Sequence, residues 1–183
     1  MSFFAIFVSA FGIHVAMRLR AEEIGGRAEA MLATATSRVR WAVSHVAAAI
    51  AGTTVLVLVA GLSAGVSFGV AVEDGARGLE VFGAATAYLP AVWVLTGIVV
   101  AAFGIVPRLP AVGWIAFTAI VLVGELGPVL ELPQWALDLS PFAHVPRLPG
   151  DALTVLPLIV LASVAAGLVL TGMLGMVRRD VPS

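Results

Sequence analysis

The sequence predicts an all-α, polytopic transmembrane helix bundle with about five spans. Hydrophobic residues make up 61% of the 183 residues, and charged residues make up only 11%. A soluble domain carries roughly 25% charged residues, so a surface this poor in charge suits lipid rather than water. Inside a bilayer every backbone polar group needs an internal partner, which favours helices. We therefore treat residues 1–183 as a single transmembrane domain.

The apolar residues form five segments, at residues 3–17, 43–72, 81–106, 111–126 and 153–177. A spanning helix needs about 20 apolar residues, which the second, third and fifth segments provide. The first and fourth segments are shorter. The connections are a polar stretch at 18–41, a short acidic one at 73–80, a proline turn at 107–110 and a proline-rich segment at 125–151.

The arginines predict the orientation of the chain. If residues 18–41 are cytoplasmic, eight of the ten arginines lie inside, and only Arg77 and Arg147 lie outside. Cytoplasmic connections are enriched in basic residues, so the N-terminus is predicted outside the plasma membrane and the C-terminus inside. An odd number of spans leads us to expect a further permease half or a second copy as a partner.

The chain lacks two residue types on which much chemistry depends. It has no lysine, so it cannot form a Walker A loop that binds ATP. It has no cysteine, and His14, His45 and His144 lie on different segments without metal-ligand spacing. We expect no metal, no cofactor and no nucleic-acid partner for this chain.

The polar stretch 18–41 is the most informative connection. Arg18 and Glu22 are four residues apart, as are Glu23 and Arg27, so each pair can interact along a helix. Gly25 and Gly26 interrupt the pattern. Residues 27–35 then have the pattern of a short amphipathic helix. The stretch is either a solvated loop that sets topology or a short helix that docks into a cytoplasmic partner.

Two runs of residues resemble a known family, the ABC-2 type permeases. The first contains Glu22, Glu23, Gly26, Arg27, Ala28, Glu29, Leu32, Ser37, Arg38, Arg40 and Trp41; the second contains Leu132, Pro133, Gln134, Trp135, Asp138, Ser140, Pro141, Phe142, His144, Pro146 and Pro149. The chain is similar to the C-terminal part of the actinobacterial permeases described as exporters of polyketide antibiotics. Full-length members carry about twice as many helices.

This resemblance implies a transport subunit rather than an enzyme. The first run would be a coupling helix in a groove of a separate ATP-binding cassette subunit, which would hold ATP and Mg²⁺. The implied contacts are Glu22, Glu23, Gly26, Arg27, Glu29 and Leu32. The implied cargo is amphiphilic, drug-like or polyketide-like.

The proline-rich segment 125–151 allows two interpretations. Pro133 suits the first turn of a short helix at 134–139, which is too short to span. The segment is either a surface loop or, as in the resembled family, a re-entrant pair of short helices forming an outer lid. Glu125, Trp135 and Phe142 are the candidate pathway or outer-gate residues.

Small residues repeat within two predicted spans. Gly61, Gly65 and Gly69 are four apart, and Gly167, Thr171 and Gly175 form a similar stripe. Such stripes let helices approach closely. Packing within the chain is the simplest interpretation, and a dimer seam or a substrate path is the alternative.

Two other functions compete with transport. Residues 61–65 match G-x-S-x-G and would make Ser63 the nucleophile of an intramembrane hydrolase, but the motif requires a preceding strand. The third possibility is a non-catalytic membrane assembly protein, which would lack an obligatory ATPase partner.

Overall fold

The computed structural model describes residues 2–24, 38–105, 112–146 and 154–178. Within these ranges the chain is helical and contains no strand, which confirms the all-α prediction. The helices are α1 Ser2–Ile24, α3 Arg38–Ala71, α4 Gly75–Thr86, α5 Leu89–Ile105, α6 Val112–Leu126, α7 Gln134–Leu137, the 3-10 helix η1 Pro141–His144 and α8 Val155–Arg178.

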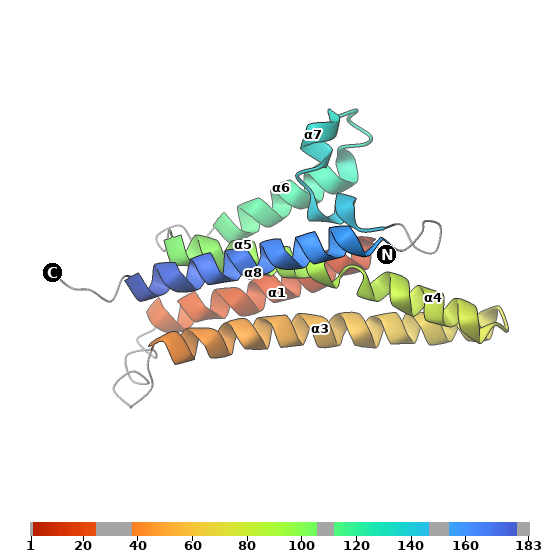
Figure 1. The fold of residues 1–183 in the computed structure, drawn as a ribbon, viewed down its shortest axis with the longest axis horizontal. Helices are drawn as coiled ribbons and strands as arrows, with labels where there is room; N and C mark the ends of the chain where they lie inside the picture. Colours follow the sequence, from red (N-terminus) through yellow and green to blue (C-terminus); the bar gives the residue numbers. More distant parts are fainter. Residues whose placement is uncertain (1, 25–37, 106–111, 147–153, 179–183) are drawn as a thin grey trace.

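The long helices run back and forth between two ends of the molecule, and the start of α1 and the end of α8 lie at opposite ends (Figure 1). Three stretches are long and apolar enough to cross a membrane: Val43–Ala71, Gly75–Ile105 and Val155–Met176. Shorter apolar stretches occupy α1 and α6, at Phe4–Val15 and Trp114–Leu126. The chain is thus a multi-pass membrane protein by length and composition, and the count of five spans stays a prediction.

The third predicted span differs from the structure, which divides it into α4 and α5. The break lies at Ala87 and Tyr88, between Thr86 and Leu89. Pro90 explains it, because proline has no N–H to donate to the carbonyl of Thr86 in a continuous helix. The two helices together still form one apolar stretch of 31 residues.

The acidic connection is also shorter than the predicted 73–80. Asp74 caps α4, and its carboxylate accepts hydrogen bonds from the backbone N–H groups of Ala76 at 2.9 Å and Arg77 at 3.4 Å. Aspartate is among the preferred N-cap residues because it satisfies amides that have no helical partner. Residues 75–80 therefore belong to the helix, and the turn itself is tight, with Glu73 at a φ of 53°.

Helices α3 and α4 form a hairpin that extends past the rest of the bundle (Figure 1). At 1.5 Å per residue, the 34 residues of α3 span about 51 Å, more than the roughly 30 Å of a hydrocarbon core. Glycines hold the two helices together closely. A Cβ on Gly65 would lie 2.6 Å from the carbonyl oxygen of Gly78, and one on Gly61 would lie 2.8 Å from the Cβ of Ala85.

One face of helix α1 packs against α3 and α5, whereas Phe7 and Phe11 of this helix are exposed. Ser9 and Ile13 are fully buried, and a Cβ on Gly12 would lie 2.7 Å from Thr53 Cγ2 and 2.8 Å from Thr96 Oγ1. The buried hydroxyls of Ser9, Thr53 and Thr96 each donate to a carbonyl four residues earlier on their own helix. This bonding satisfies the hydroxyls without water, as a membrane interior requires.

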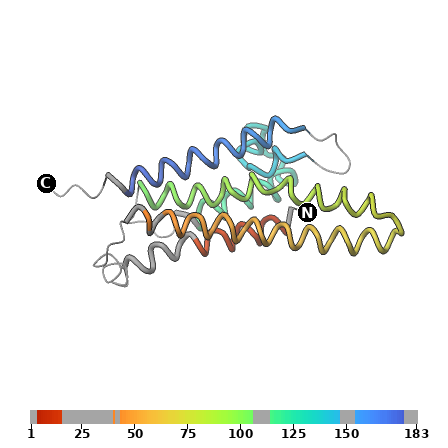
Figure 2. The backbone as a smooth tube through the Cα atoms, turned by 60° about the horizontal axis from the view of Figure 1, so that its bottom comes forward, coloured from red at the N-terminus to blue at the C-terminus, as the bar shows by residue number. Residues whose placement is uncertain are grey.

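The most extensive helix contact among the described residues joins α5 and α8, which lie side by side in Figures 1 and 2. Its centre consists of glycines. A Cβ on Gly172 would lie 2.6 Å from the carbonyl carbon of Val100, and one on Gly175 would lie 2.5 Å from the carbonyl oxygen of Gly104. The backbones of the two helices therefore touch directly, as small residues permit in membranes.

Candidate functional site

The predicted coupling residues fall at one end of the bundle. Glu22 and Glu23 lie in the last turn of α1, and Arg38 begins α3. Gly26, Arg27, Glu29 and Leu32 lie outside the described residues, as does the predicted amphipathic helix at 27–35. The C-terminal ends of α5 and α8 lie at this same end (Figure 1). The prediction that this stretch docks into a cytoplasmic partner stays a prediction.

At the opposite end, the segment after α6 folds back in short helical pieces. Gly127 makes the reversal possible, because a Cβ there would collide with the carbonyl oxygen of Val123 and with Leu137. Helix α7 begins directly after Pro133, as expected, but it ends at Leu137 rather than at residue 139. The Gln134 side chain donates to Asp138 at 2.9 Å and η1 follows, so two short helices cover the end of α6.

A cavity of about 430 Å³ lies beneath these short helices. Residues of α1, α6, α7, η1 and the connections beside them border it: Ile6, Tyr88, Ile120, Val121, Gly124, Glu125, Pro128, Gln134, Leu137, Ser140, Phe142, Ala143 and Val145. Polar and apolar groups contribute comparable shares of its wall, and the polar side chains among them include Glu125, Gln134 and Ser140.

Two of the three candidate gate residues meet at this cavity. Glu125 and Phe142 both border it, and each is partly buried. Trp135 does not border it, and its side chain is 70% exposed. Gly124, the residue directly before Glu125, packs against Ser140, since a Cβ on it would lie 2.9 Å from Ser140 Oγ.

Sequence reasoning missed two residues of this cavity, Ser140 and Tyr88. Ser140 is fully buried, and its Oγ has no hydrogen-bond partner among the described residues. Tyr88 comes from the break between α4 and α5, and its ring lies 6.5 Å from that of Phe142. Pro90 was the sequence signal for Tyr88, because a proline there predicts the helix break in which Tyr88 lies. The signal for Ser140 was that it carries the only hydroxyl in residues 132–150, the second run that resembles the family.

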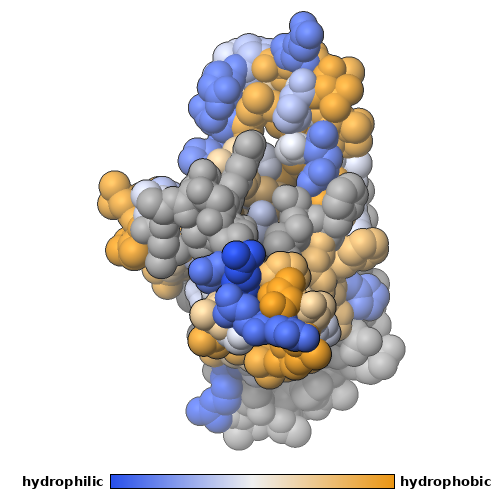
Figure 3. Space-filling view, turned by 90° about the vertical axis from the view of Figure 1, so that its right-hand side faces the viewer, coloured by the Kyte–Doolittle hydropathy of each residue, from blue (hydrophilic) through white to orange (hydrophobic). Residues whose placement is uncertain are grey.

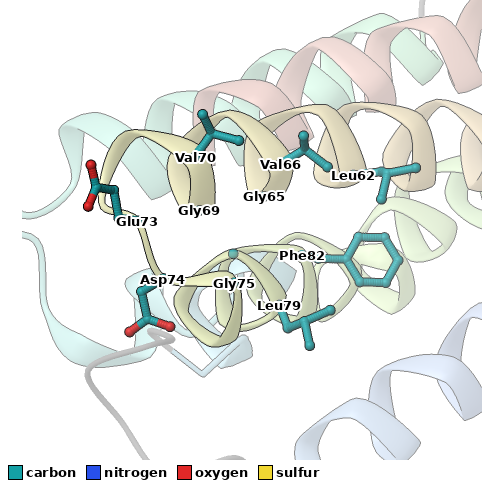
Figure 4. Close-up of a pocket in the computed structure, with 11 residues that line it drawn as sticks. Leu62, Gly65, Val66, Gly69, Val70, Glu73, Asp74, Gly75, Leu79 and Phe82 are labelled. Atoms are coloured by element: carbon teal, nitrogen blue, oxygen red, sulfur yellow. The ribbon is translucent and has the colours of Figure 1, made fainter.

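A second hollow, of about 460 Å³, follows the seam between α3 and α4 (Figure 4). Leu62, Val66 and Val70 border it from α3, and Leu79 and Phe82 border it from α4. Glycines bring the two helix backbones close together, and because they have no side chains they leave unfilled space beside the contact. Glu73 and Asp74 lie only at its tip, so the hollow offers mainly apolar contact.

Hydrophilic residues on this end of the molecule include those at the tip of the α3–α4 hairpin and those over the α7 region (Figure 3). Glu73, Arg77, Glu131 and Asp138 are all exposed. Orange apolar surface surrounds both groups in the figure. The charges of this end therefore cluster away from the long apolar helix faces.

The remaining glycines of the predicted stripes behave differently from one another. Gly69 faces Asp74 and Gly78 at 3.3 Å, and Gly175 faces Gly104. For Gly167 nothing in the described part of the chain lies within 4 Å of a Cβ position. Gly104 and Gly172, at the α5–α8 interface, are among the close contacts that the sequence pattern missed.

The hydrolase alternative finds no supporting geometry around Ser63. This residue lies in the middle of α3, and its hydroxyl donates to the carbonyl of Val59 at 2.8 Å. His45 is 18 residues earlier on the same helix, which places it about 27 Å away along the axis. Among the described residues no three His, Asp or Glu side chains come together to hold a metal ion.

The helices and the three long apolar stretches make this chain an all-helical, multi-pass membrane protein. Residues 1–176 match the family described as the C-terminal domain of the multidrug efflux system permease Rv1217c, and the chain belongs to this family. The multidrug efflux system permease protein Rv1217c of Mycobacterium tuberculosis (strain ATCC 25618 / H37Rv) is 41% identical over 174 residues. That match covers 94% of this chain and 32% of the relative, so the chain spans about a third of the relative's length.

Proposed function

We propose that this chain is the transmembrane part of an ABC-2 type, ATP-binding cassette exporter in the plasma membrane. It would move amphiphilic drug-like or polyketide-like compounds out of the cell. The observation that carries the proposal is membership of a multidrug efflux permease family over residues 1–176. The absence of lysine supports a separate ATPase, because this chain cannot supply the Walker A lysine that binds nucleotide phosphates.

The described geometry supports transport over catalysis. Two of the candidate gate residues border a cavity at one end, and the predicted coupling segment leaves α1 at the other end. An ATPase that binds the coupling segment would act on the bundle from the end opposite to the cavity. A further permease half or a second copy would complete the path.

Co-purification tests this proposal. The protein is extracted from its native membrane in a mild detergent, and the proteins that accompany it are identified by mass spectrometry. We expect an ATP-binding cassette ATPase in near-stoichiometric amount. If cells export normally but no ATPase accompanies the protein extracted from them, the proposal is contradicted. If no ATPase accompanies it and export is absent as well, the assembly-protein alternative is favoured.

The proposed orientation has its own test, since the chain contains no cysteine of its own. A cysteine placed at Glu73, at the exposed tip of the α3–α4 hairpin, is expected to react with a membrane-impermeant maleimide added to intact cells. A cysteine at Ser183 should react only after permeabilisation, because the arginine distribution places the C-terminus inside. The reverse pattern of labelling would overturn the orientation.

A further inference from the structure

The cavity between α1, the α4–α5 break, α6 and the α7–η1 segment contains a carboxylate without a counter-charge among the described residues. Glu125 borders this cavity and is partly buried. Among the described residues its carboxylate makes no hydrogen bond or ion pair, and none of the described residues that border the cavity is basic. Charged groups at membrane depth normally pair with another charge, and they mark functional sites.

Two aromatic rings border the same cavity. Tyr88 and Phe142 have ring centroids 6.5 Å apart and planes inclined by 38°. The faces of aromatic rings attract cations, and the attraction increases when water is excluded. Ile6, Ile120 and Val121 add aliphatic surface. The cavity thus combines one negative charge with aromatic and aliphatic surface on part of its wall.

A polar group in the wall also lacks a partner. Ser140 borders the cavity and is fully buried, and its Oγ has no hydrogen-bond partner among the described residues. An unsatisfied buried hydroxyl costs about 1–3 kcal/mol. A ligand that presents a polar or positively charged group beside Gly124 and Ser140 would remove that cost.

We propose that this cavity binds amphiphilic organic cations, with Glu125 as the counter-ion, Tyr88 and Phe142 as the aromatic wall, and Ser140 as a hydrogen-bonding group. A volume of about 430 Å³ lies in the range of sites that take drug-sized molecules. Amphiphilic anions of the same shape are disfavoured, because they would lie beside an uncompensated carboxylate. The inference rests on the proposed function in one respect, which is that the cavity belongs to the export path. Binding of the cation itself requires no ATPase and can be tested separately.

The test uses two ions of matched shape and opposite charge. The purified chain in lipid nanodiscs is titrated with radiolabelled tetraphenylphosphonium, and tetraphenylborate is the control ligand. We expect saturable binding of the cation and none of the anion. The E125Q variant should weaken cation binding at least tenfold, whereas E131Q should bind as the unmodified protein does. Glu131 is exposed and does not border the cavity, so it controls for a general loss of negative charge.

Several results would overturn the inference: equal binding of both ions, no saturable cation binding, or an unchanged affinity in E125Q. If E125Q does not fold, cation binding by the S140A variant is the deciding measurement, because this substitution removes only the hydroxyl that lacks a partner. Weaker cation binding by S140A at an unchanged melting temperature supports the site, and unchanged binding contradicts it. An ATPase that co-purifies with a chain unable to bind the cation would reject this inference and leave the proposed function intact.

Discussion

Replacement of Gly172 by leucine is expected to destabilise the protein by about 3 kcal/mol, at the upper end of the usual cost of overpacking. A Cβ at this position would lie 2.6 Å from the carbonyl carbon of Val100 and 2.9 Å from the amide nitrogen of Ala101. These are backbone atoms of α5, which cannot rotate away as a side chain can. The α5 and α8 helices would have to separate along the largest contact in the described part of the chain.

Thermal unfolding in detergent, followed by size-exclusion chromatography of the heated samples, measures this effect. A loss of about 3 kcal/mol corresponds to a melting temperature lower by roughly 6–12 °C for a chain of this size. Gly167→Leu is the matched control, since it makes the same change five residues earlier on α8, where nothing described lies within 4 Å. Leucine is also the better helix former, so the control should be neutral or slightly more stable. Equal destabilisation by both variants would contradict the close contact.

Charge reversal at the proposed coupling segment is expected to reduce export at least tenfold. The double variant E23K/R27E inverts both charges of a pair spaced four apart, at the end of the chain that we propose contacts the ATPase. A like-charge juxtaposition across an interface costs several kcal/mol, which is enough to lose docking. Drug accumulation in cells and ATPase activity of the purified complex, measured together, would show whether hydrolysis continues without export.

Glu80→Lys provides the control for this experiment. It makes a comparable charge change on an exposed residue of α4, at the other end of the bundle. We expect normal export from this variant. If E23K/R27E also exported normally and still co-purified with the ATPase, the assignment of this segment to coupling would be wrong, although the membership of the permease family would be unaffected.

Much of the fold could be predicted because hydropathy acts locally. The apolar segments at 43–72 and 153–177 correspond closely to α3 and α8. The break at Ala87 and Tyr88 could have been predicted from Pro90, which acts on its own helix through a missing hydrogen-bond donor. The same holds for the cap at Asp74, which fixes where α4 begins.

Less of the candidate site could be predicted, because it depends on contacts between distant segments. Glu125 and Phe142 were expected from the sequence, and the structure places both at one cavity with Tyr88, which lies 37 residues before Glu125 in the chain. No local pattern relates these three residues. Trp135, only seven residues before Phe142, borders no part of that cavity.

The sequence by itself determined that this protein is helical, lies in a membrane and cannot bind ATP through a Walker A lysine. Those properties follow from composition. The free energy of transferring a side chain into lipid depends mainly on that side chain, and the absence of lysine does not depend on the fold. The tertiary structure alone decided which glycines form helix contacts and which residues surround the carboxylate of Glu125. The sequence pattern favoured Gly167 over Gly172 as a packing residue, yet of these two only Gly172 lies against the backbone of α5. The rotation of α8 about its own axis determines which of its glycines face α5. That rotation depends on the packing of all residues along the interface, so a local pattern cannot predict it.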